Sequence, residues 1–439
     1  MKRFSLFLLS VFVLIRCASA PPARETADVR TSSFTVNGLQ VIVKHIPGDP
    51  VVATGLFLRG GTRAVPANQA GIERFFLEAA TRGTESLSKD ALNGRLESMG
   101  TSLNPEVQYD YTGLTMKCLH RSFAASWDLF RDVLLHPSFP EEEVELVREQ
   151  ILSSIRSEQD DPDSYVSLLA NNLYYQGQPY AVSLYGTESS IKGITRGALQ
   201  RYYRQQVTKA RAVLVVVGDI TPAALQPRAG ELADALPAGT MPPGMETGDF
   251  QPGPAEVKVA ERQLPTTYIL GMCPAPAPGS EDYPAFSTAF RILHDRLFEE
   301  VRTKRNLSYA PAAGVSRRAN NYGYIYVTTA YPDTTLRVMF QTIRNMEQDP
   351  LPARDLQNEI AQSITRDLMN RETAMAQMDQ LAMAEIVAGD WQTAGAYMAK
   401  LRRLTPRDIQ QAVQTYAHHF HFGIVGDPNK IDTTLFTSM

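Results

Sequence analysis

Cysteine, histidine and an excess of either charge are scarce in this 439-residue sequence. It has three cysteines, seven histidines and a formal net charge of −4, with Lys and Arg interspersed among Asp and Glu. Without a basic cluster, we expect no nucleic-acid partner and no electrostatic attraction to an anionic membrane. Two cysteines, Cys118 and Cys273, could in principle pair in an oxidising compartment. Cys118 shares a predicted strand face with Leu114 and Met116, however, which favours a small core residue over a disulfide.

The first twenty residues have the composition of a secretory signal. Lys2 and Arg3 precede an apolar run from Phe4 to Ile15, which is shorter than a spanning helix and is followed by small residues. Ala18–Ala20 offers a cleavage pattern, although two prolines follow it. Cys17 offers an alternative, the lipid acceptor of a bacterial lipoprotein, although an arginine precedes it. We therefore expect a periplasmic protein, either soluble or anchored to the outer membrane through a lipid on Cys17.

The chain is long enough for two domains of roughly 200 residues each. Prolines and glycines in residues 236–255 predict a linker between an N-terminal domain, 30–235, and a C-terminal domain, 256–439. Each half contains strands, a helix, an alternating strand pair, two long helical patterns and a closing strand that ends in Val-Gly-Asp, which indicates a duplication. Proline and acidic residues begin the long helices expected from Phe139 to Ile155 and from Leu351 to Leu368. The fold class expected is α+β, with two homologous domains, each a mainly antiparallel sheet covered by helices, that face each other as a clamp.

A family resemblance is carried by Gly61–Pro66 and, above all, by Gly71–Thr84, which reads Gly-Ile-Glu-Arg-Phe-Phe-Leu-Glu-Ala-Ala-Thr-Arg-Gly-Thr. This stretch resembles, without a gap, the segment of the insulinase-like zinc peptidases (pitrilysin and mitochondrial processing peptidase) that runs from Gly-Leu-Ala-His through Phe-Leu-Glu-His to Gly-Thr. In that family a helix carries His-x-x-Glu-His, whose two imidazoles bind Zn²⁺ while the glutamate polarises the metal-bound water. The resemblance implies the family's two-domain fold and a link to peptide hydrolysis.

The resemblance also implies that this chain has lost its own metal site. Arg74 falls on the first histidine, Leu77 on the glutamate and Glu78 on the second histidine, and the family's third ligand falls on Ser154. A guanidinium has no lone pair for zinc, and leucine cannot transfer a proton. Two other acids, Glu149 and Glu158, are out of step with the family pattern and are predicted as solvated helix charges; a set of unconventional ligands that includes Glu78 is the alternative. His418, His419 and His421 form the densest histidine cluster, but no third ligand stands at a recognisable spacing, and no metal site is predicted there.

A second motif keeps the family's functional residues. Residues 296–310 resemble the segment in which an arginine and a tyrosine, seven positions apart, hold the substrate backbone, and Arg302 and Tyr309 fall on those positions. Both side chains can donate hydrogen bonds to a peptide carbonyl and to a developing oxyanion. Taken without the resemblance, Arg302 would pair with an acid such as Glu299, and Tyr309 would pack in a sheet. The strand pair predicted in Met99–Tyr111 either offers an edge to an extended peptide or is a plain hairpin.

Members of this family divide the work between paired proteins, one with the zinc helix and the other with the Arg/Tyr pair. This sequence has the second pattern, so the resemblance implies a subunit that binds peptide through Arg302 and Tyr309 and holds no metal or cofactor. Zn²⁺ is then expected on a paralogous partner subunit in a heterodimer. Two rival functions remain: a binding or assembly module without proteolysis, and an independent metalloendopeptidase with unconventional ligands.

Overall fold

The computed structural model describes residues 29–242, called here the N-terminal half, and 250–437, the C-terminal half. The predicted signal, with Cys17, lies outside the described residues, as does the middle of the predicted linker. Within the described ranges, no helix has the length and apolarity needed to cross a membrane.

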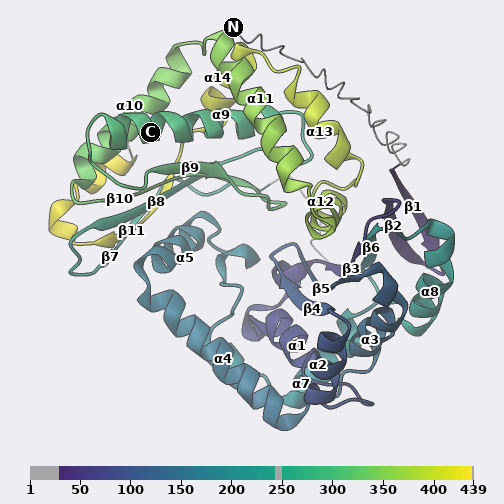
Figure 1. Cartoon of the computed structure of the whole chain (residues 1–439). Coiled ribbons are helices and arrows are strands. Elements are labelled where there is room, and N and C mark those ends of the chain that lie inside the picture. The colour runs from purple at the N-terminus through teal and green to yellow at the C-terminus, as the bar shows by residue number, and fades with distance from the viewer. Residues whose placement is uncertain (1–28, 243–249, 438–439) are drawn as a thin grey trace, which may run out of the picture.

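A mixed sheet of six strands forms the centre of the N-terminal half (Figure 1). In spatial order its strands are β1 (Arg30–Val36), β2 (Leu39–His45), β6 (Ala212–Gly218), β3 (Val51–Arg59), β5 (Tyr111–Leu119) and β4 (Ser102–Val107). Only β2 and β6 run parallel, and every other neighbouring pair is antiparallel. β6 reads Ala-Val-Leu-Val-Val-Val-Gly and is buried along its whole length, because this β-branched run lies in the middle of the sheet with both faces covered.

The five-stranded sheet of the C-terminal half repeats this arrangement. In spatial order its strands are β7 (Val257–Glu261), β11 (His421–Gly426), β8 (Thr267–Pro274), β10 (Tyr322–Thr329) and β9 (Ala312–Val315). Its first pair is parallel and the remaining pairs are antiparallel, as in the series β2-β6-β3-β5-β4 of the other half. The α+β fold with two antiparallel-rich sheets is confirmed, and β6 and β11 are the two closing strands that end in Val-Gly-Asp.

Helices fill the connections between these strands. In the N-terminal half they are α1 (Ile72–Ala80), α2 (Lys89–Ser98), α3 (Phe123–Leu135), α4 (Glu141–Asp160), α5 (Pro162–Tyr174), α6 (Glu188–Gly193), α7 (Arg196–Gln206) and α8 (Pro222–Ala235). In the C-terminal half they are α9 (Tyr283–Leu297), α10 (Pro332–Gln348), α11 (Ala353–Asn370), α12 (Ala374–Val387), α13 (Thr393–Leu401) and α14 (Pro406–Tyr416). The two predicted long helices are α4 and α11, and both begin directly after a proline with acidic residues in the first turn, where the helix dipole favours negative charge.

Each half lends one helix to the sheet of the other. α12, from the C-terminal half, packs on β3 and β6, while α5, from the N-terminal half, packs on β8 and β11 (Figure 1). The apolar cluster under α12 contains Ile42, Ala53, Phe57, Val213, Val215 and Val217 from the sheet and Ala374, Met378, Leu381, Ala382 and Ile386 from the C-terminal half. The sheet face that points toward the other half is therefore covered in both halves, and the halves interlock.

The two cysteines in the described residues are buried and unpaired, as expected. Cys118 lies in β5 and Cys273 in β8, so they belong to different sheets. Burial raises the pKa of the Cys118 thiol to about 11, which keeps it protonated and unreactive at neutral pH.

Candidate functional site

Helix α1 carries three of the predicted site residues, and its start is fixed by Gly71. This glycine has φ 85°, and a Cβ there would lie 2.4 Å from the carbonyl oxygen of Tyr185, so only glycine fits. The face of α1 that includes Phe75 and Phe76 is buried in the core of the N-terminal half. Arg74 and Glu78, one turn apart, are left on the other face.

The side chains at the first and second ligand positions form an ion pair with each other. The Arg74 Nη1 donates to Glu78 Oε1 at 3.0 Å, and both side chains are partly exposed. The Arg74 guanidinium also stacks on the ring of Tyr185, 4.6 Å from its centroid. Leu77, at the general-base position, is 5% exposed and belongs to the apolar core. The Arg74 guanidinium therefore already binds the Glu78 carboxylate, which is the one carboxylate at the predicted ligand positions of this helix.

Ser154, at the position of the third ligand, lies on α4 and turns back onto its own helix. Its Oγ donates to the carbonyl oxygen of Gln150 at 3.0 Å. In the two described ranges, no three His, Cys, Asp or Glu side chains are grouped as metal ligands would be. We call Arg74, Leu77, Glu78 and Ser154 the α1–α4 centre.

The prediction for Glu158 was wrong, because this residue is not a solvated helix charge. Its carboxylate is partly buried near the α1–α4 centre and is hydrogen-bonded by Ser183. Burial raises the pKa of Glu158, while Ser183 and the charge of Arg74 oppose that shift. Glu149, the other acid, is exposed as expected.

Arg302 and Tyr309 lie together at the far end of α9, where a π-helical turn, Phe298–Thr303, follows the helix. The Arg302 guanidinium is 4.0 Å from the centroid of the Tyr309 ring and 4.7 Å from that of Phe298. Tyr309 is 77% exposed and precedes β9 rather than packing in the sheet. Arg302 therefore stacks on aromatic rings, and its expected alternative partner, Glu299, lies 4.0 Å from Lys304 instead. Tyr309 is therefore exposed and Arg302, which stacks on it, is partly exposed.

Comparison with known proteins identifies the family of this chain. The family model described as "Insulinase (Peptidase family M16)" matches residues 40–188, and the model described as "Peptidase M16 inactive domain" matches residues 193–363. The chain belongs to the insulinase family. An uncharacterized zinc protease of Mycobacterium bovis is 22% identical over 90% of this chain and 92% of its own length. The mitochondrial-processing peptidase subunit beta of Saccharomyces cerevisiae is 25% identical over 71% of this chain and 68% of its own length.

Solved structures share the fold at low sequence identity. A crystal structure of a peptidase M16 inactive domain from Pseudomonas fluorescens has a TM-score of 0.82 and 19% identity, and the match covers 91% of this chain and 98% of that one. The periplasmic protease PqqL from Escherichia coli has a TM-score of 0.78 and 13% identity, covering 97% of this chain and 49% of that one. The two-domain fold of the insulinase family is therefore common to these chains.

The residues present do not fit the zinc of the insulinase family. Arg74 offers five donors and no acceptor, Leu77 offers neither, and the one carboxylate at the ligand positions, Glu78, is engaged by Arg74. Zinc sites use three or four nitrogen, sulfur or oxygen ligands. No hydrolytic step can be assigned to these side chains.

Sequence reasoning missed a buried network that anchors this insulinase-family helix. Glu73, in the first turn of α1, accepts hydrogen bonds from Tyr202 at 2.7 Å, Thr112 at 2.8 Å and Arg211 at 3.2 Å. The side chains of Glu73 and Arg211 are 0% and 1% exposed, so this is a fully buried ion pair. A sequence signal existed: Glu73 stands between apolar residues on the buried face of an amphipathic helix.

The histidine cluster does not converge on one point. The rings of His418 and His419 meet edge to face at 4.7 Å, and His419 has φ 54°, so the chain turns there before β11 begins. His421 points elsewhere: its ring is buried against Tyr174, and its Nε2 lies 3.2 Å from the carbonyl oxygen of Gly253. Burial lowers the pKa of His421 and favours the neutral ring.

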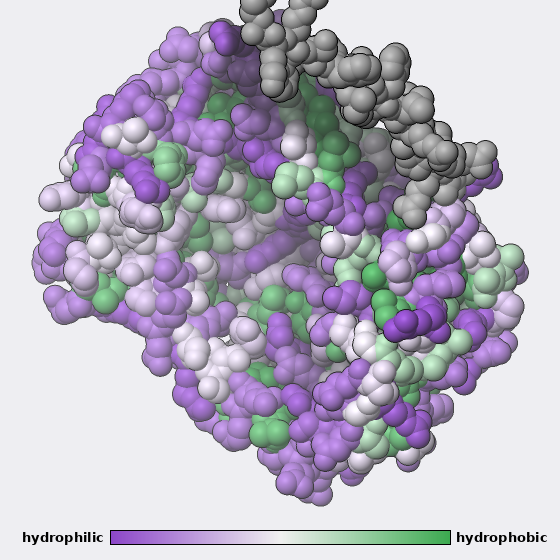
Figure 2. Space-filling view, viewed as in Figure 1, coloured by the Kyte–Doolittle hydropathy of each residue, from purple (hydrophilic) through white to green (hydrophobic). Residues whose placement is uncertain are grey.

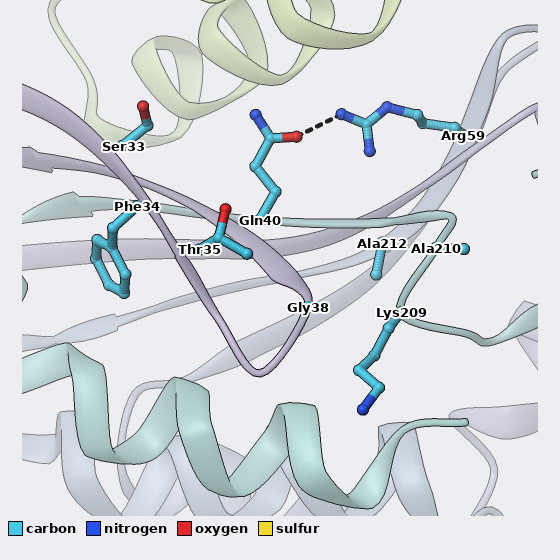
Figure 3. Close-up of a pocket in the computed structure, with 9 residues that line it drawn as sticks. All are labelled: Ser33, Phe34, Thr35, Gly38, Gln40, Arg59, Lys209, Ala210 and Ala212. Atoms are coloured by element: carbon cyan, nitrogen blue, oxygen red, sulfur yellow. Dashed lines mark hydrogen bonds between the residues drawn. The ribbon is translucent and has the colours of Figure 1, made fainter. Parts of the chain in front are cut away.

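The surface of the described residues has several hollows that are open to solvent. The space-filling view shows one between the two halves, where hydrophilic and hydrophobic side chains are mixed (Figure 2). A cavity of about 380 Å³ lies beside β1 and β2 (Figure 3). Two cations line it: Arg59, which hydrogen-bonds Gln40 at 2.6 Å and Glu385 at 2.9 Å, and Lys209. Among the described strands, β4 pairs with β5 alone and is an edge strand, so both alternatives for this segment, a peptide-binding edge and a plain hairpin, stay open.

Proposed function

We propose that this chain is a catalytically incomplete subunit of the insulinase family that binds peptides and pairs with a zinc-bearing partner for their hydrolysis. The observation that supports this most directly is the contrast between the two motifs. The α1–α4 centre holds an internal ion pair, Arg74 with Glu78, in place of metal ligands. In the other motif, by contrast, Arg302 stacks on the ring of Tyr309, whose side chain is exposed to solvent.

Such a pair suits peptide binding without local zinc. The guanidinium is permanently charged and the phenol is a neutral donor, so both can hydrogen-bond a backbone carbonyl and strengthen that bond as negative charge develops. Stacking of Arg302 on the Tyr309 and Phe298 rings fixes the direction of the guanidinium before a peptide arrives. Preorganised donors lose less entropy on binding than free side chains.

The partner in this proposal is a paralogous subunit with an intact His-x-x-Glu-His, which holds the Zn²⁺. One relative of this chain is named as a subunit, the mitochondrial-processing peptidase subunit beta. We place the pair in the periplasm, soluble or attached through a lipid on Cys17, because the N-terminal sequence has the pattern of an export signal. One structural neighbour is described as a periplasmic protease.

The test is reconstitution of this chain with a paralogue that carries an intact His-x-x-Glu-His. We expect the mixture to cleave an unstructured peptide library in a chelator-sensitive way, and Arg302→Ala or Tyr309→Phe to lower kcat/KM by about a hundredfold, the usual effect of losing one oxyanion donor. Tyr331→Phe is the matched control, since Tyr331 is also an exposed tyrosine of this half.

Two other outcomes identify the rival functions. A complex that forms and cleaves peptides equally well with and without Arg302 and Tyr309 would leave only a scaffolding role. Stoichiometric zinc in the purified single chain, with chelator-sensitive hydrolysis, would make it an independent metalloendopeptidase.

A further inference from the structure

The loop between β9 and β10 reaches out of the C-terminal half and is enclosed by the N-terminal half. Arg318, near its middle, donates from Nη1 to the Asn171 Oδ1 of α5 at 2.6 Å. The same guanidinium lies 3.9 Å from the ring centroid of Tyr109, 5.1 Å from that of Tyr322 and 5.3 Å from that of Tyr175. A desolvated cation is stabilised by aromatic faces at such distances.

The backbone of this loop is also bound by the N-terminal half. The amide of Ala319 donates to Asp110 Oδ2 at 3.1 Å, and Asp110 sits in the turn between β4 and β5. The phenols of Tyr174 and Tyr175, at the end of α5, donate to the carbonyl oxygens of Asn321 and Asn320. Two segments of the N-terminal half, the end of α5 and the turn between β4 and β5, therefore hold one short loop of the other half.

Asp110, which accepts the hydrogen bond from the loop amide of Ala319, is itself held by several partners. Asp110 is 4% exposed, receives a hydrogen bond from Tyr180 at 2.5 Å and lies 3.3 Å from the Nε of Arg63. Breaking its bond to Ala319 would leave a buried carboxylate short of one partner, which costs free energy. Breaking the hydrogen bond between Asp110 and the loop on its own is therefore unfavourable.

We propose that residues 316–321 form a latch that locks the two halves into one rigid body on the side of the β4–β5 hairpin. Arg318 holds the latch in place through its contacts with Asn171 and the tyrosine rings, and Asp110 accepts the hydrogen bond from the latch backbone. This inference concerns the conformation of the chain alone and stands whether or not the chain pairs with a zinc subunit. Its consequence is that the edge strand β4 and the Arg302 and Tyr309 pair keep one fixed relation, so a peptide is bound without an internal hinge motion.

The latch also adjoins the α1–α4 centre. Burial raises the pKa of the Tyr109 phenol, Arg318 acts against that shift, and Glu158 adds to it, so Tyr109 lies within the field of both charges. Glu158 in turn lies within the field of Arg74. The charges at the seam between the halves and those of the α1–α4 centre therefore lie within electrostatic reach of each other.

Hydrogen exchange of the full chain, read by mass spectrometry, tests the latch. In the wild type we expect slow exchange in peptides that cover residues 316–322 and 108–112. Arg318→Ala should accelerate exchange in both peptides by about tenfold or more, a change of about 1.4 kcal/mol in the free energy of local opening. Arg318→Lys, which keeps a cation, should have a smaller effect.

Arg317→Ala is the matched control, because it removes the same charge from the neighbouring, exposed position of the loop. Equal exchange in the Arg317→Ala and Arg318→Ala variants would overturn the latch. If the Arg318→Ala variant also loses protection from exchange in β6, it unfolds as a whole. The milder variants Asp110→Asn and Arg318→Lys then test the latch. Faster exchange confined to the two peptides supports the latch, and unchanged exchange there overturns it.

Discussion

At the scale of single residues, Arg74 and Glu78 of the α1–α4 centre form an ion pair at the positions where the family resemblance predicts metal ligands. Arg74 and Glu78 are spaced by one helical turn, which is the spacing that lets two imidazoles share one metal ion and equally lets a guanidinium reach a carboxylate. The ungapped match to the family predicts that the backbone positions are still those of a zinc site.

Restoring the ligands is therefore expected to restore metal binding. A variant with Arg74→His, Leu77→Glu, Glu78→His and Ser154→Glu should bind about one Zn²⁺ per chain, since three protein ligands and a water complete a catalytic zinc site. Zinc content after dialysis and calorimetric titration measure the effect. The same variant without Ser154→Glu serves as the control and should bind more weakly. A folded fourfold variant that takes up no zinc would show that the positions do not correspond.

Two carboxylates from different halves interact at residue scale as well. Asp379, on α12, is exposed as a residue, but desolvation of its carboxyl group and the negative charge of Glu106 raise its pKa to about 6. A carboxyl whose folded pKa is raised is favoured in its protonated form, so its ionisation costs stability as pH rises from about 3.9 through the folded value.

Asp379→Asn should therefore stabilise the protein at pH 8 and change little at pH 4. We expect a gain of about 1 kcal/mol at pH 8, reduced from the full linkage value because the side chain is partly solvated. Urea unfolding at the two pH values measures this difference, with Asp390→Asn, an exposed acid of the same half, as control. Equal gains at both pH values would contradict the proposed titration.

At the scale of elements, helix α1 is held in place by the buried pair Glu73 and Arg211. Removing one member leaves the other charge buried without a partner, which typically costs about 3–5 kcal/mol. We expect that loss for Glu73→Leu, measured by urea unfolding. The double variant Glu73→Leu with Arg211→Met should recover most of it, because a hydrophobic pair can replace a buried ion pair at little cost. A double variant as unstable as the single one would assign the loss to packing instead.

The elements show what the sequence could and could not predict. The repeated Val-Gly-Asp strands and the two proline-led helices follow from local signals, and they appear as β6, β11, α4 and α11. The burial of Glu158 did not follow, because helical periodicity places a side chain on a face but does not tell which neighbour covers that face. The role of Arg318 could not be predicted for a similar reason, because it lies in a loop of the C-terminal half and its partner Asn171 lies in the N-terminal half.

At the scale of the whole molecule, the exchange of α5 and α12 makes the two halves one thermodynamic unit. If the C-terminal half unfolded alone, α12 would leave β3 and β6, and their apolar face would be exposed. Each large side chain returned to water costs about 1.5–3 kcal/mol, so several of them together approach the entire stability of a typical domain. The linker between the halves therefore does not make them independent.

Unfolding is accordingly expected to be a single transition, and the two tryptophans of the chain can report on it. Trp127 is buried in α3, and Trp391 packs beside the α12 cluster, so each half contains one reporter. The Trp391→Phe variant keeps Trp127 as the reporter of the N-terminal half, and the Trp127→Phe variant keeps Trp391 as the reporter of the C-terminal half. After correction for the effect of each substitution on stability, the urea midpoints of fluorescence in the two variants should agree. Circular dichroism of both variants provides the control, since its transition must coincide with the fluorescence. Two separated midpoints would mean that the halves unfold one after the other and that helix exchange does not couple them.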